Sequence, residues 1–399
     1  MAMTRAAALL MGLSTAGAAC AQAPAPATTT DDPFIRGLKE GKLLLDARVR
    51  YETVDDNIND DAEGLTVRTR LGYETAPIGG FRLLGEFTDT RSLFGINDYA
   101  PEEPGYAIIA DPSSTAVNRA VISYEGWKMA WLAIGRQRII LDNARWVGNV
   151  GWRQQEQTYD AGSVDLNFGG GWKLSYDYLD SVQGVVPALD ADVSDHIVNL
   201  SYSGWQAGTL VGYGYLLKDD DSDDERNTYG LRFSGSAQGS ALTWLYTAEY
   251  AYQTYDPGAG GSFAMDYYSL QGGIGFKAVT VQLGYEVLGS DGGDSALQTP
   301  LATKFAFNGW ADLFLTTPAD GLRDAYANLT ADWLGLKWMA VYHDFRADDG
   351  GDRYGDEWDL RISKAFGKNY LVGMQYARYQ ADEFSKDRNK FWLWFELKV

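Results

Sequence analysis

The sequence lacks the residues on which several common protein classes depend. Only one of its 399 residues is cysteine, Cys20, so a framework of disulfide bonds is excluded. Outside the extreme N-terminus, no stretch approaches the roughly 20 apolar residues that a membrane helix needs, which excludes a helical membrane protein. Acidic residues outnumber basic ones by 54 to 34, and the net charge of −20 argues against nucleic-acid binding.

Histidine, proline and the common enzyme motifs are also scarce. His196 and His343 are the only histidines, and the chain contains no HExxH, GxSxG or P-loop motif. The 11 prolines fall mostly between the apolar runs, so they leave those runs free to form strands. We expect no cofactor and no metal site.

Aromatic residues and glycine, by contrast, are abundant. The chain has 25 Tyr, 13 Trp, 16 Phe and 45 Gly. Aromatic side chains favour strands, and glycine favours tight turns. A composition with many of both and few long apolar runs therefore indicates an all-β protein.

Apolar and polar residues alternate with a period of two from Lys42 onward. The first such run places on one face Leu43, Leu45, Ala47, Val49 and Tyr51. The last run places on one face Phe391, Leu393, Phe395, Leu397 and Val399. This pattern predicts strands with one apolar and one polar face. An apolar final strand of this kind is also the signal that the barrel-assembly machinery reads.

The connections between these strands alternate between short and long. Short ones include 77–80, 126–128 and 169–171, whereas 94–115 and 289–323 are long. About eighteen strands of around ten residues fit a transmembrane antiparallel β-barrel with short periplasmic turns and long extracellular loops. A soluble β-sandwich would not separate turn lengths so regularly, and a propeller would repeat near 40 residues. Trp131, Trp172, Trp244, Trp333, Trp338 and Trp358 lie near predicted strand ends, where interfacial girdles fall.

The N-terminus has the features of an export signal. Arg5 is followed by a short apolar run and by an Ala-x-Ala cleavage site that ends at Ala23. We therefore predict a signal peptide at 1–23, a flexible mature N-terminus at 24–41 and a barrel at 42–399. The expected location is the bacterial outer membrane, with membrane lipid and lipopolysaccharide as neighbours. Acidic loops such as 55–61 are expected to be solvated.

The polar faces of the first three strands are rich in arginine. Alternation directs inward Arg48, Arg50, Arg68, Arg70 and Arg82. Further along the chain, it also directs inward Arg119, Arg232 and Arg361. Guanidinium groups bind carboxylates in bidentate fashion, so such rows can bind or steer anions. Pairing with nearby acidic residues would equally satisfy a polar interior, and both interpretations stay open.

One segment resembles the signature of the alginate-export family. It runs from Gly135 to Ala161 and reads GRQRIILDNARWVGNVGWRQQEQTYDA. The resemblance implies an eighteen-stranded outer-membrane barrel whose arginine-rich constriction passes an anionic polysaccharide. It makes candidate constriction residues of Arg136, Arg138, Arg145 and Arg153, and candidate loop-folding residues of Asp142, Asn143 and Asn149. Alternation with Leu132 and Ile134 directs Arg136 outward unless a bulge intervenes.

We therefore expect a passive channel for anionic polysaccharide or other anionic solutes, and not an enzyme. A general small-solute porin is one alternative, which ion selectivity distinguishes. An outer-membrane lipid hydrolase is a remote alternative, since Ser194 and His196 share a lipid-directed face and Ser–His pairs can perform acyl chemistry. His343 is expected to line the lumen.

Overall fold

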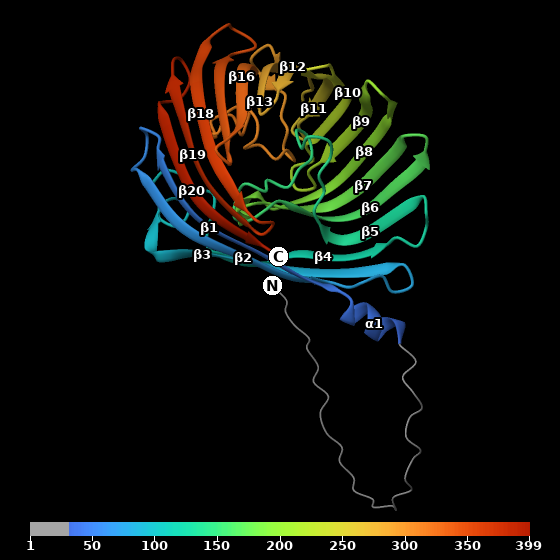
Figure 1. The fold of residues 1–399 in the computed structure, drawn as a ribbon. Coiled ribbons are helices and arrows are strands. Elements are labelled where there is room, and N and C mark those ends of the chain that lie inside the picture. Colours follow the sequence, from blue (N-terminus) through green and yellow to red (C-terminus); the bar gives the residue numbers. More distant parts are fainter. Residues whose placement is uncertain (1–31) are drawn as a thin grey trace, which may run out of the picture.

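The computed structural model describes residues 32–399, so the predicted signal peptide and Cys20 lie outside the described residues. Eighteen antiparallel strands form one closed sheet. The sheet closes because β1 (Lys42–Asp55) pairs both with β2 (Ala62–Glu74) and with the last strand, β20 (Arg388–Lys398). Closure gives every strand two hydrogen-bonded neighbours, as a lipid environment requires. The predicted β-barrel is confirmed (Figure 1).

The other barrel strands follow one another around the ring in chain order. The first half comprises β3 (Phe81–Asp98), β4 (Ser114–Tyr124), β5 (Ala130–Gln137), β6 (Thr158–Gly169), β7 (Trp172–Gln183), β8 (Ala191–Trp205), β9 (Gly208–Lys218) and β10 (Glu225–Gln238). The second half comprises β11 (Thr243–Asp256), β12 (Phe263–Phe276), β13 (Val279–Leu288), β16 (Leu322–Trp333), β17 (Leu336–Arg346), β18 (Arg353–Phe366) and β19 (Tyr370–Ala381). Two short strands, β14 (Ser290–Asp291) and β15 (Ser295–Ala296), form a separate hairpin inside the long connection before β16.

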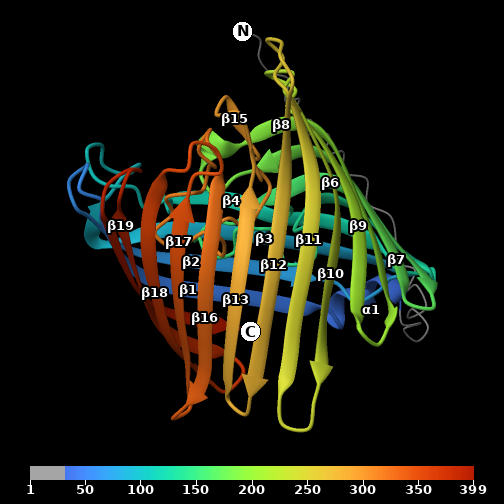
Figure 2. The same ribbon diagram turned by 90° about the horizontal axis from the view of Figure 1, so that it is seen from above.

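Short turns gather at one end of the barrel and long loops at the other (Figure 2). The turn at Leu334 and Gly335 shows why the short connections suffice. Both residues have positive φ, at 56° and 69°, which matches the twist of a two-residue hairpin. The loop end carries the connections 99–113, 138–157 and 289–321. We call these two ends the short-turn end and the loop end.

The outer face is apolar and carries two sets of exposed aromatic residues. Beside the short turns lie Trp127, Trp172, Trp205, Trp244 and Trp333. Toward the loop end lie Tyr229, Tyr250, Tyr252, Tyr268 and Tyr285. Amphipathic rings favour the two membrane–water interfaces, so these sets mark the borders of the apolar band.

A short helix precedes the barrel, within the segment 24–41 that we expected to be flexible. Helix α1 (Pro33–Lys39) begins at Asp32, whose side chain accepts from the backbone N–H of Phe34 at 2.9 Å. The carbonyl of Gly37 accepts from the N–H of Ala76 at 3.0 Å, which ties the helix to the turn after β2. Within residues 32–399, no helix has the length and apolar character needed to cross a membrane.

Candidate functional site

Residues 138–157, between β5 and β6, fold into the barrel interior, and we call them the first inner loop (Figure 1). Two arginines of β1 hold this loop by its backbone. The carbonyl oxygen of Trp152 accepts from Arg48 at 2.7 Å and from Arg50 at 2.5 Å. A buried loop must find donors for its carbonyl groups, and the wall supplies them. These arginines, predicted to line the pore, thus serve as loop anchors.

A carboxylate inside the same loop completes its attachment. Glu156 lies 3.4 Å from Arg70 of β2 and accepts from Arg138 at 2.8 Å. Its oxygens also accept from Asn118 of β4 at 2.7 Å and from Asn149 at 2.6 Å. Burial alone would raise the pKa of Glu156, but Arg70 and Arg138 lower it to about 2. Glu156 therefore stays ionised and anchors the loop across the physiological pH range.

Residues 289–321 form a second inner loop. Wall carboxylates accept hydrogen bonds from its backbone N–H groups, and Arg388 of β20 also donates to the carbonyl oxygen of Ala311 at 3.2 Å. Asp359 of β18 accepts from the N–H of Trp310 at 3.2 Å, and Glu357 accepts from that of Ala311 at 2.7 Å. Hydrogen bonds to charged acceptors are stronger than neutral ones. The sequence predicted this long loop but not its place inside the barrel.

The two inner loops are also joined to each other. The backbone N–H of Gly148 donates to the carbonyl oxygen of Leu301 at 2.8 Å. Arg145 of the first loop reaches Glu286 on β13 at 2.8 Å and Asn308 of the second loop at 3.1 Å. The loops therefore form one connected structure across the lumen.

A compact network of buried charges links the two inner loops with the connection 99–113. It contains the cations Arg50, Arg153 and Lys390 and the carboxylates Glu52, Asp111 and Asp312. Arg153 lies 3.1 Å from Glu52 and 2.6 Å from Asp312, which also lies 2.6 Å from Lys390. Burial would raise the pKa of Asp312, but Lys390 and Arg153 lower it. The opposite charges balance, so this network holds the loops without a net charge of its own.

Aromatic rings pack beneath this network. Trp152 stacks on Phe305 of the second inner loop, with 4.6 Å between ring centroids, and meets Trp394 of β20 edge-on at 5.1 Å. The Arg361 guanidinium lies 4.3 Å from the centroid of the Trp310 ring. Such contacts fill the lumen beside β1 and β20 with side chains, so the passage is narrower than the barrel itself.

Several inward arginines have N–H groups that donate to no acceptor within the described residues. Within residues 32–399, no hydrogen-bond partner exists for Nε of Arg50, Nε and Nη1 of Arg68, or Nε of Arg70. Arg361 donates to the neutral Gln375 at 2.6 Å. Each of these buried arginines nevertheless has a carboxylate partner, which is Asp111 for Arg50, Asp46 for Arg68 and Glu156 for Arg70.

Other inward arginines are fully paired. Arg119 lies 2.8 Å from Glu86, and Arg232 lies 2.8 Å from Glu249. A bulge between β3 and β4 brings both Asn118 and Arg119 to the same carboxylate. Pairing with nearby acidic residues, one of the two interpretations left open by the sequence, therefore holds for these arginines.

Two predicted pore residues lie elsewhere. Arg136 shares the outer face of β5 with Ile134, which is 65% exposed, and pairs there with Asp160 at 2.7 Å. No bulge redirects it, so its prediction as a constriction residue is wrong. Arg82 lies at the short-turn end and pairs with Glu125 of the adjacent turn at 2.9 Å, away from the first inner loop.

The three predicted loop-folding residues do contact the first inner loop or the wall beside it. The side chain of Asp142 accepts from Asn199 of β8 at 2.8 Å, and burial raises its pKa. Asn143 accepts from the backbone N–H of Arg145 at 3.4 Å, and Asn149 donates to Glu156. Each contact stabilises a bend of the loop.

Sequence reasoning missed several of the charged residues that hold the inner loops, and it did not place the second inner loop inside the barrel. Missed residues include Glu156, Asp312, Lys390, Glu357 and Asp359. Glu357 and Asp359 share a polar face with Arg361 at a period of two, and that signal could have marked β18 as a charged wall. Asp312 lies in an irregular loop, where no period exists to place it.

The side chains of the Ser–His alternative have separate partners. Ser194 donates to Asp220 at 3.0 Å, while Nδ1 of His196 lies 2.9 Å from the hydroxyl of Tyr176. His343 lies inside the barrel, 2.9 Å from Asp324, as the alternation predicted. A Ser–His pair needs a hydrogen bond between the two side chains, and Ser194 and His196 instead bind different partners.

The closed barrel, its apolar band and its charged interior define a channel of the bacterial outer membrane. The chain belongs to the alginate export family, whose sequence profile matches residues 43–289. No curated protein matches it. The resemblance drawn from the segment 135–161 is thus confirmed.

Solved structures of outer-membrane channels share the fold. OccAB3 of Acinetobacter baumannii aligns with a TM-score of 0.71 at 15% identity, over 90% of this chain and 99% of its own. OpdK of Pseudomonas aeruginosa, solved with vanillate, aligns with a TM-score of 0.70 at 16% identity, over 91% of this chain and 99% of its own. At such identities the likeness shows the fold alone.

Proposed function

We propose that this protein is an anion-selective channel for small anionic solutes. The observation that carries the proposal is the concentration of four inward guanidinium groups, those of Arg48, Arg50, Arg68 and Arg70, on the adjacent strands β1 and β2. A concentration of fixed cations on the lumen wall lowers the energy of a passing anion and raises that of a cation. Arg361, which has a neutral hydrogen-bond partner, extends this positive surface onto β18.

The filling of the lumen favours small solutes over a polysaccharide. An eighteen-stranded barrel without inner loops would enclose a wide aqueous channel. Here two inner loops cross the interior and pack their rings against β20. OpdK, which has the same fold, was solved with vanillate, a small carboxylate, and that size suits a passage narrowed by loops.

Reconstitution tests the proposal directly. Purified protein in a planar bilayer, under a gradient of potassium chloride, is expected to show a reversal potential that indicates chloride preference. Liposome swelling is expected to be faster with glucuronate than with glucosamine, which is similar in size and opposite in charge. Equal rates would favour the general porin, and cation preference would overturn the proposal.

A further inference from the structure

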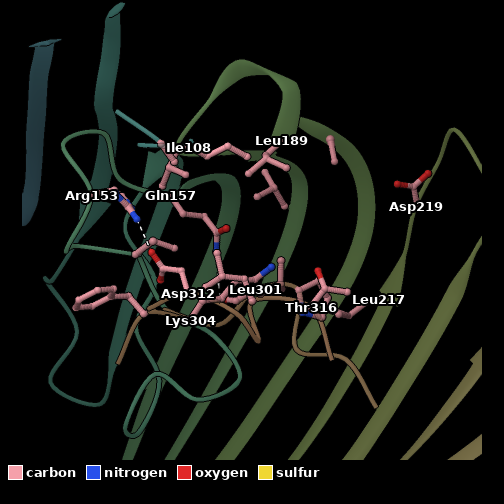
Figure 3. Close-up of a pocket in the computed structure, with 18 of the residues that line it drawn as sticks. Ile108, Arg153, Gln157, Leu189, Leu217, Asp219, Leu301, Lys304, Asp312 and Thr316 are labelled. Carbon is pink, nitrogen blue, oxygen red and sulfur yellow. Dashed lines mark hydrogen bonds and ion pairs between the residues drawn. The ribbon is translucent and has the colours of Figure 1, made fainter. Parts of the chain in front are cut away.

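A cavity of about 640 Å³ opens among the loops at the loop end (Figure 3). Its inner boundary includes Arg153, Asp312 and Lys390 of the buried charge network. Figure 3 shows the Arg153–Asp312 pair at one side of the space, with Leu189 and Leu217 on the others. A solute from the loop end would occupy this cavity before it meets the arginines of β1 and β2.

Most of the cavity wall is apolar, although it faces water. The apolar side chains of the wall include those of Ile108, Val185, Leu189, Leu217, Leu301 and Leu315. Ile108, Leu189 and Leu315 are 65%, 58% and 41% exposed. An exposed apolar surface in a concave site of this size is typical of ligand pockets for molecules with an apolar body.

The carboxylates around the cavity already have donors. They are Asp56, Asp195, Asp219, Asp224 and Asp312, each of which accepts hydrogen bonds from neighbouring backbone or side-chain groups. Of the lining cations, Lys218, Arg388 and Lys390 each have a carboxylate within 4.0 Å, as does Arg153. The acidic groups therefore leave little unsatisfied negative charge to attract a cation.

Two lining cations have no such partner in the described part of the chain. Lys304 makes no ion pair or side-chain hydrogen bond within residues 32–399, and burial, with a smaller effect of Arg145, lowers its pKa. Arg226 lies 4.0 Å from the centroid of the Tyr255 ring and donates to the neutral Gln253 at 3.3 Å. These two groups give the cavity positive charge that is free to bind an anion.

We propose that the cavity binds a small amphipathic carboxylate, with its carboxylate near Lys304 and Arg226 and its apolar body against the Leu189–Leu315 wall. The inference rests on the proposed anion channel and names the class of solute. A sugar acid fits less well, because its hydroxyl groups need hydrogen-bond partners that an aliphatic wall does not provide. Inorganic phosphate would leave the apolar wall uncovered.

Current block in planar bilayers tests this proposal, with 3-phenylpropionate and glucuronate as probes of equal charge. Each probe is added at the loop end in potassium chloride. Phenylpropionate is expected to block at about a tenfold lower concentration, because its ring leaves water on binding. Equal blocking concentrations, in a channel that still prefers anions, would overturn this inference and leave the proposed function intact. Cation preference would overturn the proposed function itself.

Variants separate the two halves of the site. Lys304→Gln is expected to weaken the current block by both probes. The double variant Leu189→Ser, Leu315→Ser is expected to remove only the preference for phenylpropionate. Both leucines are exposed, so their replacement does not disturb packing. Lys368→Gln, in an exposed short turn, is the matched control and should change neither probe. If the leucine variant keeps the tenfold preference, the apolar wall does not bind the solute.

Discussion

The two inner loops occupy the same lumen, but different groups of the wall bind their backbones. Wall arginines hold the first loop by its carbonyl oxygens, as Arg48 does at Trp152. Wall carboxylates hold the second loop by its N–H groups, as Glu357 does at Ala311. A barrel wall can therefore position irregular backbone with either sign of charge, provided that each buried polar group finds a partner.

Charged side chains are also distributed unevenly around the barrel wall. The sector from β18 through β20 to β2 carries many of the charged residues that anchor the loops, and Glu286 of β13 adds a further anchor. The sector from β10 to β13 borders a second cavity of about 460 Å³. No charged residue lines this cavity within the described part of the chain, and its polar lining includes Ser234, Ser236, Thr247, Gln271 and Gln282. Open space at the short-turn end thus lies against neutral polar side chains. Charge is concentrated where the loops narrow the passage.

The largest expected effect is at the attachment of the second inner loop. Gly309 has a φ of +84°, and a Cβ there would lie 2.5 Å from the Glu357 carboxylate. Gly309→Ala is expected to cost about 2 kcal/mol or more, because strain and the clash combine, and to release this loop from β18. Single-channel recordings should then show a larger and noisier conductance.

Gly292→Ala is the matched control in the same loop. Gly292 also has positive φ, +63°, but no atom lies within 4 Å of its added Cβ. It should lose only about 1 kcal/mol from backbone strain and keep the conductance of the unmodified protein. Identical traces from both variants would mean that Glu357 does not hold the loop.

The next largest effect concerns the first inner loop. Glu156→Gln replaces the charge-assisted hydrogen bonds of Arg70 and Arg138 with neutral ones, which is expected to weaken the attachment by about 1.5 kcal/mol. Trypsin should then cleave detergent-solubilised protein within residues 138–157. Glu383→Gln, at an exposed loop position, should leave the loop resistant. An intact loop in the Glu156 variant would contradict its role as an anchor.

A smaller effect follows from pH. The pKa of Glu156 in the folded protein is about 2, below its ordinary value of 4.5, so its stabilising contribution is complete above about pH 4.5. That contribution is lost as the pH falls toward 2. Conductance should therefore stay constant from pH 7 to about 5 and become noisy only in stronger acid. A transition near pH 6 would show that another group controls the loop.

The alternation of apolar and polar residues in the sequence predicted whether most wall residues face the lumen or the membrane. Arg48, Arg232 and His343 lie inside as expected, and Trp244 lies outside. The barrel class and strand number followed from turn lengths. These features depend on local backbone geometry, which each strand repeats along its length.

The contacts within the site were less predictable, because the direction in which a side chain points does not specify the residue that it contacts. Alternation placed Arg50 and Arg68 inward but could not show that Arg50 meets Asp111, a residue of a different connection. The family resemblance outweighed alternation at Arg136, and alternation was correct there. Loop residues such as Arg153 have no period, so only the folded structure locates them.

The most direct test compares selectivity in variants of two arginines, one inside and one outside. Arg68→Gln removes an inward guanidinium and leaves the carboxylate of its partner Asp46 in the lumen, whereas Arg136→Gln removes a guanidinium that pairs with Asp160 on the outer face. In a potassium chloride gradient, the Arg68 variant should shift the reversal potential toward cation preference, while the Arg136 variant should match the unmodified channel. If the Arg68 variant keeps full anion preference, the lumen arginines do not select the solute.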